Sequence, residues 1–123
     1  MFNKTKDDTK NMNILHLTPV RQLEHEIDES TGFINVLVPK FTSKFFGKFI
    51  QSRLKDRYFK ADLDEFGTAA WHKIDGKRKV SKISKELLEE FGDKIQPVNH
   101  RLALFMNRLY NSGFITFLEI ERK

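Results

Sequence analysis

The residues most able to do chemistry, the histidines and the paired carboxylates, are scattered along the chain. A metal site needs ligands that recur on one helix or strand face, and the four histidines have no such spacing: His16, His25, His72 and His100. Glu24 and Glu26 flank His25, so on a strand both carboxylates would point to one face and suggest acid–base chemistry. Nothing else in the sequence converges on them, and a polar edge strand explains the pattern. We expect no catalytic residue, no metal ion and no cofactor.

The cysteine and glycine patterns exclude further classes of chemistry. The 123 residues contain no cysteine, which excludes disulfides, thiolate metal sites and a cysteine nucleophile. A cytoplasmic location is the default for such a chain. The six glycines are isolated, so no phosphate-binding loop is present. No apolar run approaches the roughly 20 residues that span a bilayer. The sequence therefore predicts a cytoplasmic protein that is not an enzyme.

One segment, residues 40–57, holds the whole net charge. The chain carries a formal charge of +5, and this segment has one acidic residue, Asp56, against six basic ones: Lys40, Lys44, Lys48, Arg53, Lys55 and Arg57. Phe41, Phe45 and Phe49 recur at helical spacing, which predicts an amphipathic helix with the lysines on its other side. The basic side is either a solvated surface, a docking site for an acidic partner or a contact with an anionic membrane. The candidate partner-docking residues are Lys40, Lys44, Lys48 and Arg53.

The patterning of the other residues predicts an α+β fold. Residues 1–13 are polar and indicate a disordered tail, and residues 14–123 are long enough for a single domain. Runs rich in β-formers predict strands, and periods of 3.6 predict helices, of which the first is capped by Asp64 and the second ends at Gly92. The expected strands are 20–27, 33–38, 58–63 and 114–120, and the expected helices are 65–74, 80–91 and 97–111. An N-terminal three-stranded antiparallel sheet followed by three helices is the order of a winged helix-turn-helix-like domain, here with an extra amphipathic helix between strands 2 and 3.

An ordered set of residues resembles the PqqD family (pyrroloquinoline quinone biosynthesis protein D), whose members are also known as RiPP recognition elements. The set begins where the third strand ends and closes after the third helix: Leu63-Asp64-Glu65, Gly67, Trp71, Asp75-Gly76, Val80, Ile83, Leu87 and Gly113-Phe114-Ile115. Two features depart from the family pattern. The segment 40–57 replaces a tight turn, and Lys79 stands where a capping threonine is common, so the second helix is expected to be capped by Ser81 or poorly capped.

The resemblance implies a function as well as a fold. Such domains act as peptide chaperones in cofactor or natural-product biosynthesis: they bind the leader of a ribosomally made precursor peptide and present it to a modifying enzyme, often a radical-SAM maturase. The leader adds as a strand to the third strand of the sheet and lies against the third helix. The peptide-binding residues that this implies are Tyr58, Phe59, Lys60, Ala61, Asp62, Leu63, Ala103, Met106 and Tyr110.

The third helix has more apolar positions than one core stripe needs. Val98, Leu102, Phe105 and Leu109 form one stripe, and the set Ala103, Met106 and Tyr110 lies beside it. This second set either packs on the strands or lines a peptide groove, in which alanine leaves room and methionine adapts. The sequence does not decide which face of the third strand is accessible.

Two other functions fit the same fold. A winged-helix DNA-binding regulator would read DNA with the third helix. That helix has only Arg101 and Arg108 as fixed cations, and the helix before it has several carboxylates that phosphate would repel: Glu86, Glu89 and Glu90. DNA is therefore an unlikely partner. A non-catalytic scaffold subunit is the other alternative, and an exposed strand edge allows either a monomer or an edge-paired dimer.

Overall fold

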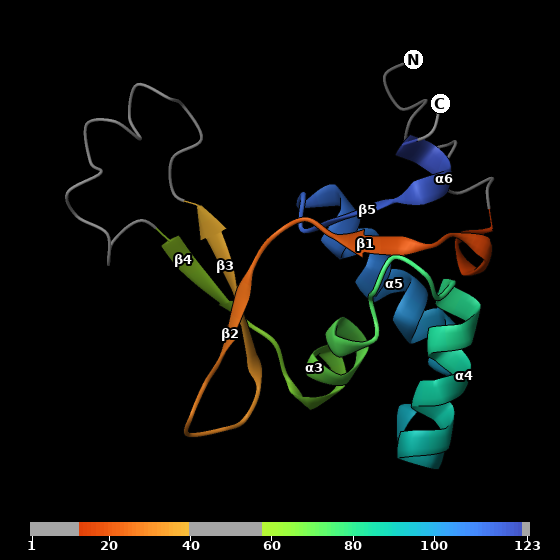
Figure 1. Ribbon diagram of the computed structural model, residues 1–123. Helices are drawn as coiled ribbons and strands as arrows, with labels where there is room; N and C mark the ends of the chain where they lie inside the picture. The colour runs from red at the N-terminus through yellow and green to blue at the C-terminus, as the bar shows by residue number, and fades with distance from the viewer. Residues whose placement is uncertain (1–12, 40–57, 122–123) are drawn as a thin grey trace. The chain divides into compact units, whose positions relative to one another are not determined.

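The computed structural model describes residues 13–39 and 58–121, which form two compact units (Figure 1). The central unit is Leu23–Thr68, and the terminal unit combines Met1–Gln22 with Ala69–Lys123. The predicted helix at 40–57 and nearly all of the predicted tail lie outside the described residues. The single domain predicted over residues 14–123 stays a prediction.

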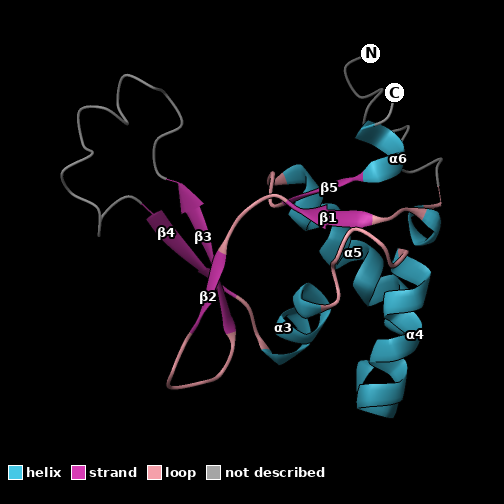
Figure 2. Cartoon of the chain, viewed as in Figure 1, coloured by secondary structure: helices cyan, strands magenta, loops and turns pink. Residues whose placement is uncertain are grey.

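The central unit contains a three-stranded antiparallel sheet, as the sequence predicts. Its strands are β2 (His25–Ile27), β3 (Ile34–Pro39) and β4 (Tyr58–Asp62), in the order β2-β3-β4 (Figure 2). The loop between β2 and β3 is closed by Asp28, whose carboxylate accepts hydrogen bonds from the Ser30 amide and hydroxyl at 2.8 and 2.7 Å. These local bonds to an Asx side chain favour a turn over a longer strand. Val36 in the centre of β3 lies opposite His25 on one side and Ala61 on the other.

A helix cap connects the sheet to α3 (Glu65–His72). The Asp64 carboxylate accepts the Gly67 amide at 2.7 Å, which confirms the predicted N-cap. The first turn places the Thr68 hydroxyl where it accepts the buried Ile34 amide at 2.9 Å. The carbonyl of the same Ile34 accepts the Leu63 amide at 2.9 Å. The amide and the carbonyl of Ile34, the first residue of β3, thus both have hydrogen-bond partners on the β4 side of the strand.

The terminal unit contains the longer helices and a two-stranded sheet. α4 (Val80–Phe91) leads through the 3-10 helix η3 (Gly92–Ile95) to α5 (Val98–Asn111), which contacts α4. β1 (Pro19–Arg21), preceded by the 3-10 helix η1 (Ile14–His16), pairs antiparallel with β5 (Ile115–Phe117), and the short helix α6 (Leu118–Glu121) follows. The fully buried side chains of this unit include Trp71, Ile83, Leu87, Leu102, Met106 and Phe117.

Both ends of α4 have the caps that the sequence predicts. Gly92 follows the helix with a φ of 64°, a left-handed conformation that glycine adopts without a steric penalty, and its amide donates to the Leu88 carbonyl. Lys79 occupies the N-cap position and makes no side-chain capping hydrogen bond. The poor N-terminal cap that its identity predicts is confirmed.

Three predicted boundaries were wrong. The run 20–27 is not one strand but parts of two, because Gln22 donates to the Phe114 carbonyl in the terminal unit while Glu24 accepts from Leu37 in the central unit. The run 114–120 is a strand only over Ile115–Phe117 and then becomes α6. The first helix ends at His72 instead of Ile74. The winged arrangement of strands and helices stays a prediction.

Chain reversal after β5 is stabilised by Glu119. Its carboxylate accepts the Thr18 amide and the Thr18 hydroxyl, each at 2.7 Å, and the Leu118 amide donates to the Thr18 carbonyl. Burial alone would raise the pKa of Glu119, but the hydrogen bonds from Thr18 outweigh it, so the pKa lies below the ordinary 4.5. A charged carboxylate therefore stabilises the end of the terminal unit.

Replacement of Thr68 by valine should destabilise the central unit. Valine has the same shape but no acceptor for the buried Ile34 amide, and such an orphaned donor costs about 1–3 kcal/mol. Urea unfolding should show this loss, and the Ile34 amide should exchange faster with solvent. Thr68→Ser keeps the hydroxyl and should retain most of the stability; equal losses in both variants would contradict the role of this hydrogen bond.

Replacement of Glu119 by glutamine should destabilise the protein in a pH-dependent way. Because the folded-state pKa is lowered, the wild-type carboxylate contributes fully above pH 4.5 and loses its contribution as the pH falls through the folded value. At pH 7 the variant should lose about 1.5 kcal/mol, the low end for hydrogen bonds to a charged group, since the side chain is only half-buried. Urea unfolding at pH 7 and pH 3 should show the difference from wild type shrinking at the lower pH. A difference independent of pH would contradict this assignment.

Candidate functional site

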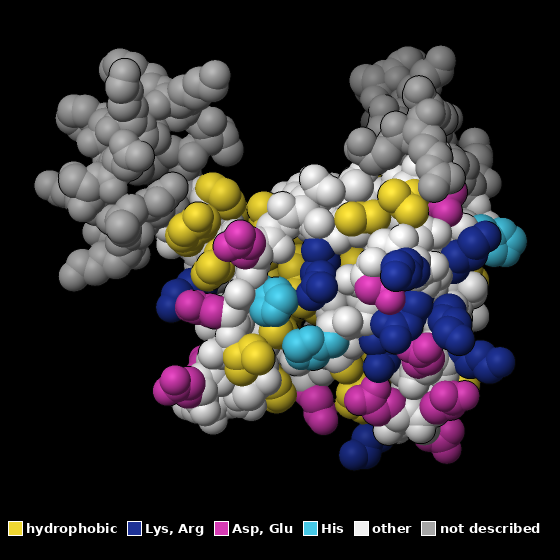
Figure 3. Space-filling model, in the orientation of Figure 1, with side chains coloured by type: hydrophobic (Ala, Val, Ile, Leu, Met, Phe, Trp, Pro, Cys, Tyr) yellow, Lys and Arg dark blue, Asp and Glu magenta, His cyan; other side chains and the backbone are white. Residues whose placement is uncertain are grey.

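β4 is an edge strand of the central sheet. Among the described residues, β3 is its only neighbour in that sheet (Figure 1). Most of its side chains are exposed, and two large apolar ones stand out: Tyr58 is 38 % exposed and Phe59 is 60 % exposed. The space-filling view shows hydrophobic side chains at this end of the sheet (Figure 3). An exposed edge with apolar side chains is a surface on which another strand can pair.

The hydrogen-bond pattern tells which main-chain groups of β4 face outward. In an antiparallel pair, hydrogen-bonded and non-hydrogen-bonded residue pairs alternate. Leu63 donates to Ile34, which lies opposite it, so the main-chain groups of Leu63, Ala61 and Phe59 point to β3. Those of Asp62, Lys60 and Tyr58 consequently point away from β3. The edge thus offers the amides and carbonyls of alternate residues.

The same register assigns the two faces of the strand. Phe59, Ala61 and Leu63 share a face with Ile34 and Val36, which are completely buried. Ala61 and Leu63 are half-buried there, while Phe59, at the end of the row, stays exposed. Tyr58, Lys60 and Asp62 lie on the opposite face. The structure therefore supplies the side-chain orientation that the sequence leaves open.

The opposite face carries an ion pair that spans the sheet. The Lys60 ammonium lies 2.7 Å from the Glu26 carboxylate, across β3 from it. The hydrogen bond to Glu26, followed by the attraction of the same carboxylate, raises the pKa of Lys60 above its ordinary value. Both side chains are exposed, so the pair is screened by solvent and contributes little to stability. Its effect is to keep Lys60 charged and held over the sheet.

The predicted peptide contacts on α5 are less exposed than those on β4. Ala103 and Tyr110 are half-buried, and the Tyr110 ring packs at 5.2 Å from that of Phe117. Met106 is completely buried. The buried stripe of the helix is Val98, Leu102, Met106 and Leu109, with Phe105 only partly covered. Met106 thus offers no surface in this structure, whereas Ala103 and Tyr110 offer some.

One exposed apolar residue of this helix is not among the residues predicted from the sequence to bind peptide. Leu104 is 49 % exposed, between Arg101 and Arg108 on the solvent side of α5. Its position two residues after the buried Leu102 places it on the opposite face, and helical spacing alone would have revealed this.

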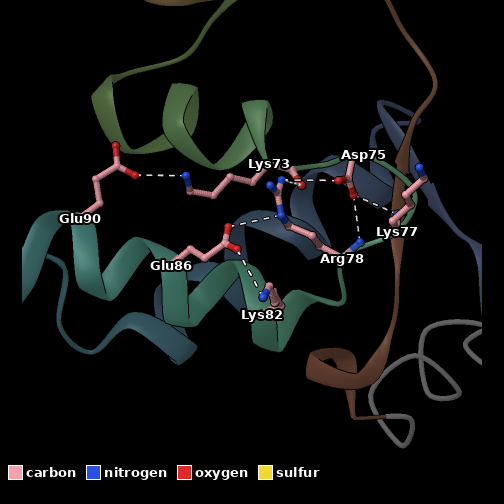
Figure 4. A network of polar contacts seen from close by, with 7 residues as sticks. All are labelled: Lys73, Asp75, Lys77, Arg78, Lys82, Glu86 and Glu90. Atoms are coloured by element: carbon pink, nitrogen blue, oxygen red, sulfur yellow. Dashed lines mark hydrogen bonds and ion pairs between the residues drawn. The ribbon is translucent and has the colours of Figure 1, made fainter.

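Two of the three acidic residues of α4, Glu86 and Glu90, form ion pairs within the terminal unit. Glu86 accepts Arg78 at 3.4 Å and Lys82 at 3.9 Å, and Glu90 accepts Lys73 at 3.2 Å (Figure 4). Hydrogen bonds from the amides of Arg78 and Lys77 are the main reason that the pKa of Asp75 is lowered. In the space-filling view, acidic and basic side chains intermingle over α4 (Figure 3). This part of the surface therefore forms no basic patch.

The described residues offer neither a metal site nor a membrane span. Within residues 13–39 and 58–121, no group of three or more His, Asp or Glu residues is arranged to hold a metal ion. No helix in the part of the chain that the structure describes is long and apolar enough to cross a membrane. The candidate docking residues Lys40, Lys44, Lys48 and Arg53 lie outside the described residues, so their role stays a prediction.

Comparison with known proteins identifies the family. Neither the curated proteins nor the solved structures gave a match to the chain. One family model does match, that of coenzyme PQQ synthesis protein D (PqqD), over residues 54–115. The matched segment is just over half of the chain and includes β4, α3, α4 and α5. The exposed edge and the helix with the predicted contacts thus both fall within it, and the chain belongs to the PqqD family.

Proposed function

We propose that this protein is a peptide-binding adaptor without catalytic activity of its own. It recognises the leader of a ribosomally made precursor peptide by adding the leader as a strand to β4. It then presents the peptide to a modifying enzyme, such as a radical-SAM maturase, in the cytoplasm. The observation that carries this proposal is the exposed edge of β4, which lies inside the segment that matches the family.

The edge has the groups that strand addition requires. Lys60 and Asp62 each turn an amide and a carbonyl away from β3, so an added strand can exchange main-chain hydrogen bonds with both. Each such bond contributes about 0.5–1.5 kcal/mol net, independent of the peptide sequence. Specificity then comes from side chains on alternate faces of the added strand, one set beside Phe59 and the other beside Lys60.

Family membership adds contacts on α5. Ala103 and Tyr110 keep exposed area that a peptide side chain can cover, and the Tyr110 hydroxyl can accept or donate a hydrogen bond. Met106 would act indirectly, as part of the buried stripe that holds the helix in shape. The basic residues predicted for partner docking are the proposed contact with an acidic surface of the modifying enzyme.

A proline at position 60 or 62 should weaken leader binding by about tenfold or more and leave the fold intact. Proline has no amide proton and is tolerated at edge strands, because the donor that it removes does not bond within the sheet. Loss of one hydrogen bond and the added clash should weaken binding by about tenfold or more for Lys60→Pro and for Asp62→Pro. The measurement is fluorescence anisotropy of a labelled peptide that copies the leader of a short precursor encoded beside this chain.

Two matched variants separate the edge from other effects. Ile27→Pro makes the same change on β2, where the amide also points away from β3, and should leave binding unchanged. Lys60→Ala removes the side chain and the ion pair with Glu26 but keeps the amide, so most of the affinity should remain. Undiminished binding by both β4 proline variants, folded by circular dichroism, would refute strand addition on β4.

Salt dependence should distinguish this function from DNA binding. A protein that contacts 6–10 phosphates loses about 10³–10⁵ in affinity between 50 and 200 mM salt, whereas main-chain pairing changes little. We expect the leader peptide to bind with nearly constant affinity over this range and duplex DNA to bind only weakly at the low end. The ion pairs of Glu86 and Glu90 favour this outcome, because they already neutralise cations next to α4. Tight duplex binding with a steep salt dependence would instead support the winged-helix regulator.

A further inference from the structure

The exposed edge of β4 can pair with the same edge of a second copy of the chain. Because the outward main-chain groups belong to Tyr58, Lys60 and Asp62, a second copy of β4 can form hydrogen-bonded pairs only between even-numbered residues. Antiparallel registers centred on the middle of the strand therefore place Lys60 opposite Lys60, Lys60 opposite Asp62, or Asp62 opposite Asp62. The first brings two lysines and the third two aspartates together at the two-fold axis, which destabilises a cross-strand pair. The third would also set Lys60 opposite Asp64, but Asp64 lies beyond the end of β4 and its carboxylate caps α3.

The remaining register has complementary side chains at its three central pairs, with the Glu26 carboxylate that lies 2.7 Å from Lys60 on the same face. Its two-fold axis passes through Ala61, so Lys60 of each copy faces Asp62 of the other, and each of these pairs exchanges both main-chain hydrogen bonds. On the other face, the exposed Phe59 lies opposite Leu63 of the second copy, an apolar pair. The small Ala61 side chains meet at the axis.

We propose that the β4 edge is an interface with a second copy of this chain, paired antiparallel about Ala61. Many edge strands avoid association through charged side chains, above all lysines, through proline or through bulges. This edge instead has a lysine, Lys60, and an aspartate, Asp62, on the same face. Their opposite charges favour the antiparallel pairing in which Lys60 of one copy faces Asp62 of the other. The short strand makes the dimer weak and dependent on concentration.

The pairing needs no peptide, so it is independent of the proposed function. One consequence does rest on that function: a leader that uses the Lys60 and Asp62 amides and a second copy of the chain exclude each other. Free protein would then be partly dimeric, and peptide-loaded protein monomeric.

Disulfide trapping tests the register. Because the chain contains no cysteine, a single introduced cysteine can form a disulfide only with the same residue of another copy. In this register, residues 61 of the two copies form a non-hydrogen-bonded pair with Cα atoms about 4.5 Å apart, within disulfide reach. Residues 59 are offset by four positions, roughly 14 Å, and are out of reach. Under mild oxidation of the full chain, Ala61→Cys should give a disulfide-linked dimer with at least about tenfold higher yield than Phe59→Cys. Random collisions would give the opposite order, because residue 59 is the more exposed.

Charge exchange tests the pairing without a cysteine. Lys60→Asp and Asp62→Lys each place like charges at every Lys60–Asp62 pair, so either variant alone should sediment at the mass of one chain. An equimolar mixture restores opposite charges at both pairs and should recover the concentration-dependent doubling of mass that the wild type shows. Lys85→Asp changes an exposed charge on α4 by the same amount and should sediment like the wild type. A wild type that stays at the mass of one chain, a mixture that does not associate, or equal trapping at 59 and 61 would overturn the proposal.

Discussion

The arrangement of the central unit depends on how Ile34 uses its main-chain groups. The Ile34 carbonyl accepts a hydrogen bond from the Leu63 amide, and the Ile34 amide donates to the Thr68 hydroxyl. This one residue of β3 therefore holds both the end of β4 and the start of α3. Because pairing and side-chain direction both alternate with a period of two, this one contact decides which residues of β4 turn their main chain outward. A slip of one residue would bury Lys60 and expose Ala61.

The described surface offers the outward main-chain groups of β4 next to side chains whose charges are partly paired. Around α4 several charged side chains are paired with one another, as in the Arg78–Glu86 and Lys73–Glu90 pairs. On the central sheet, Lys60 is held by Glu26. The central unit also has a strand edge with the exposed Phe59 beside it, and in the terminal unit Ala103 and Tyr110 of α5 are partly exposed.

Local signals in the sequence were sufficient where the stabilising contacts are local. The Asp64 cap, the Gly92 terminus and the loop at Asp28 depend on neighbours a few residues away, and each was predictable. The run 20–27 was not, because its first part pairs with a strand near the other end of the chain and leaves the central sheet before β2 begins. For the site, the sequence and its resemblance indicated the strand and the helix, but not which amides face outward, nor that Met106 is buried. Both depend on register and packing, which periodicity does not determine.

The connectivity of the chain has a consequence for biosynthesis. The central unit lies, in sequence, between the two parts of the terminal unit, and β1 must wait for β5, almost a hundred residues later. During translation, β2 and β3 can therefore pair first, and β4 can join them before α4 has been made. The long-range β1–β5 pairing forms only after β5 has been synthesised, and closing such a long loop is entropically costly and slow. The strand edge would thus exist on the nascent chain before the remaining helices do. At that stage an unpaired edge exposes the chain to aggregation.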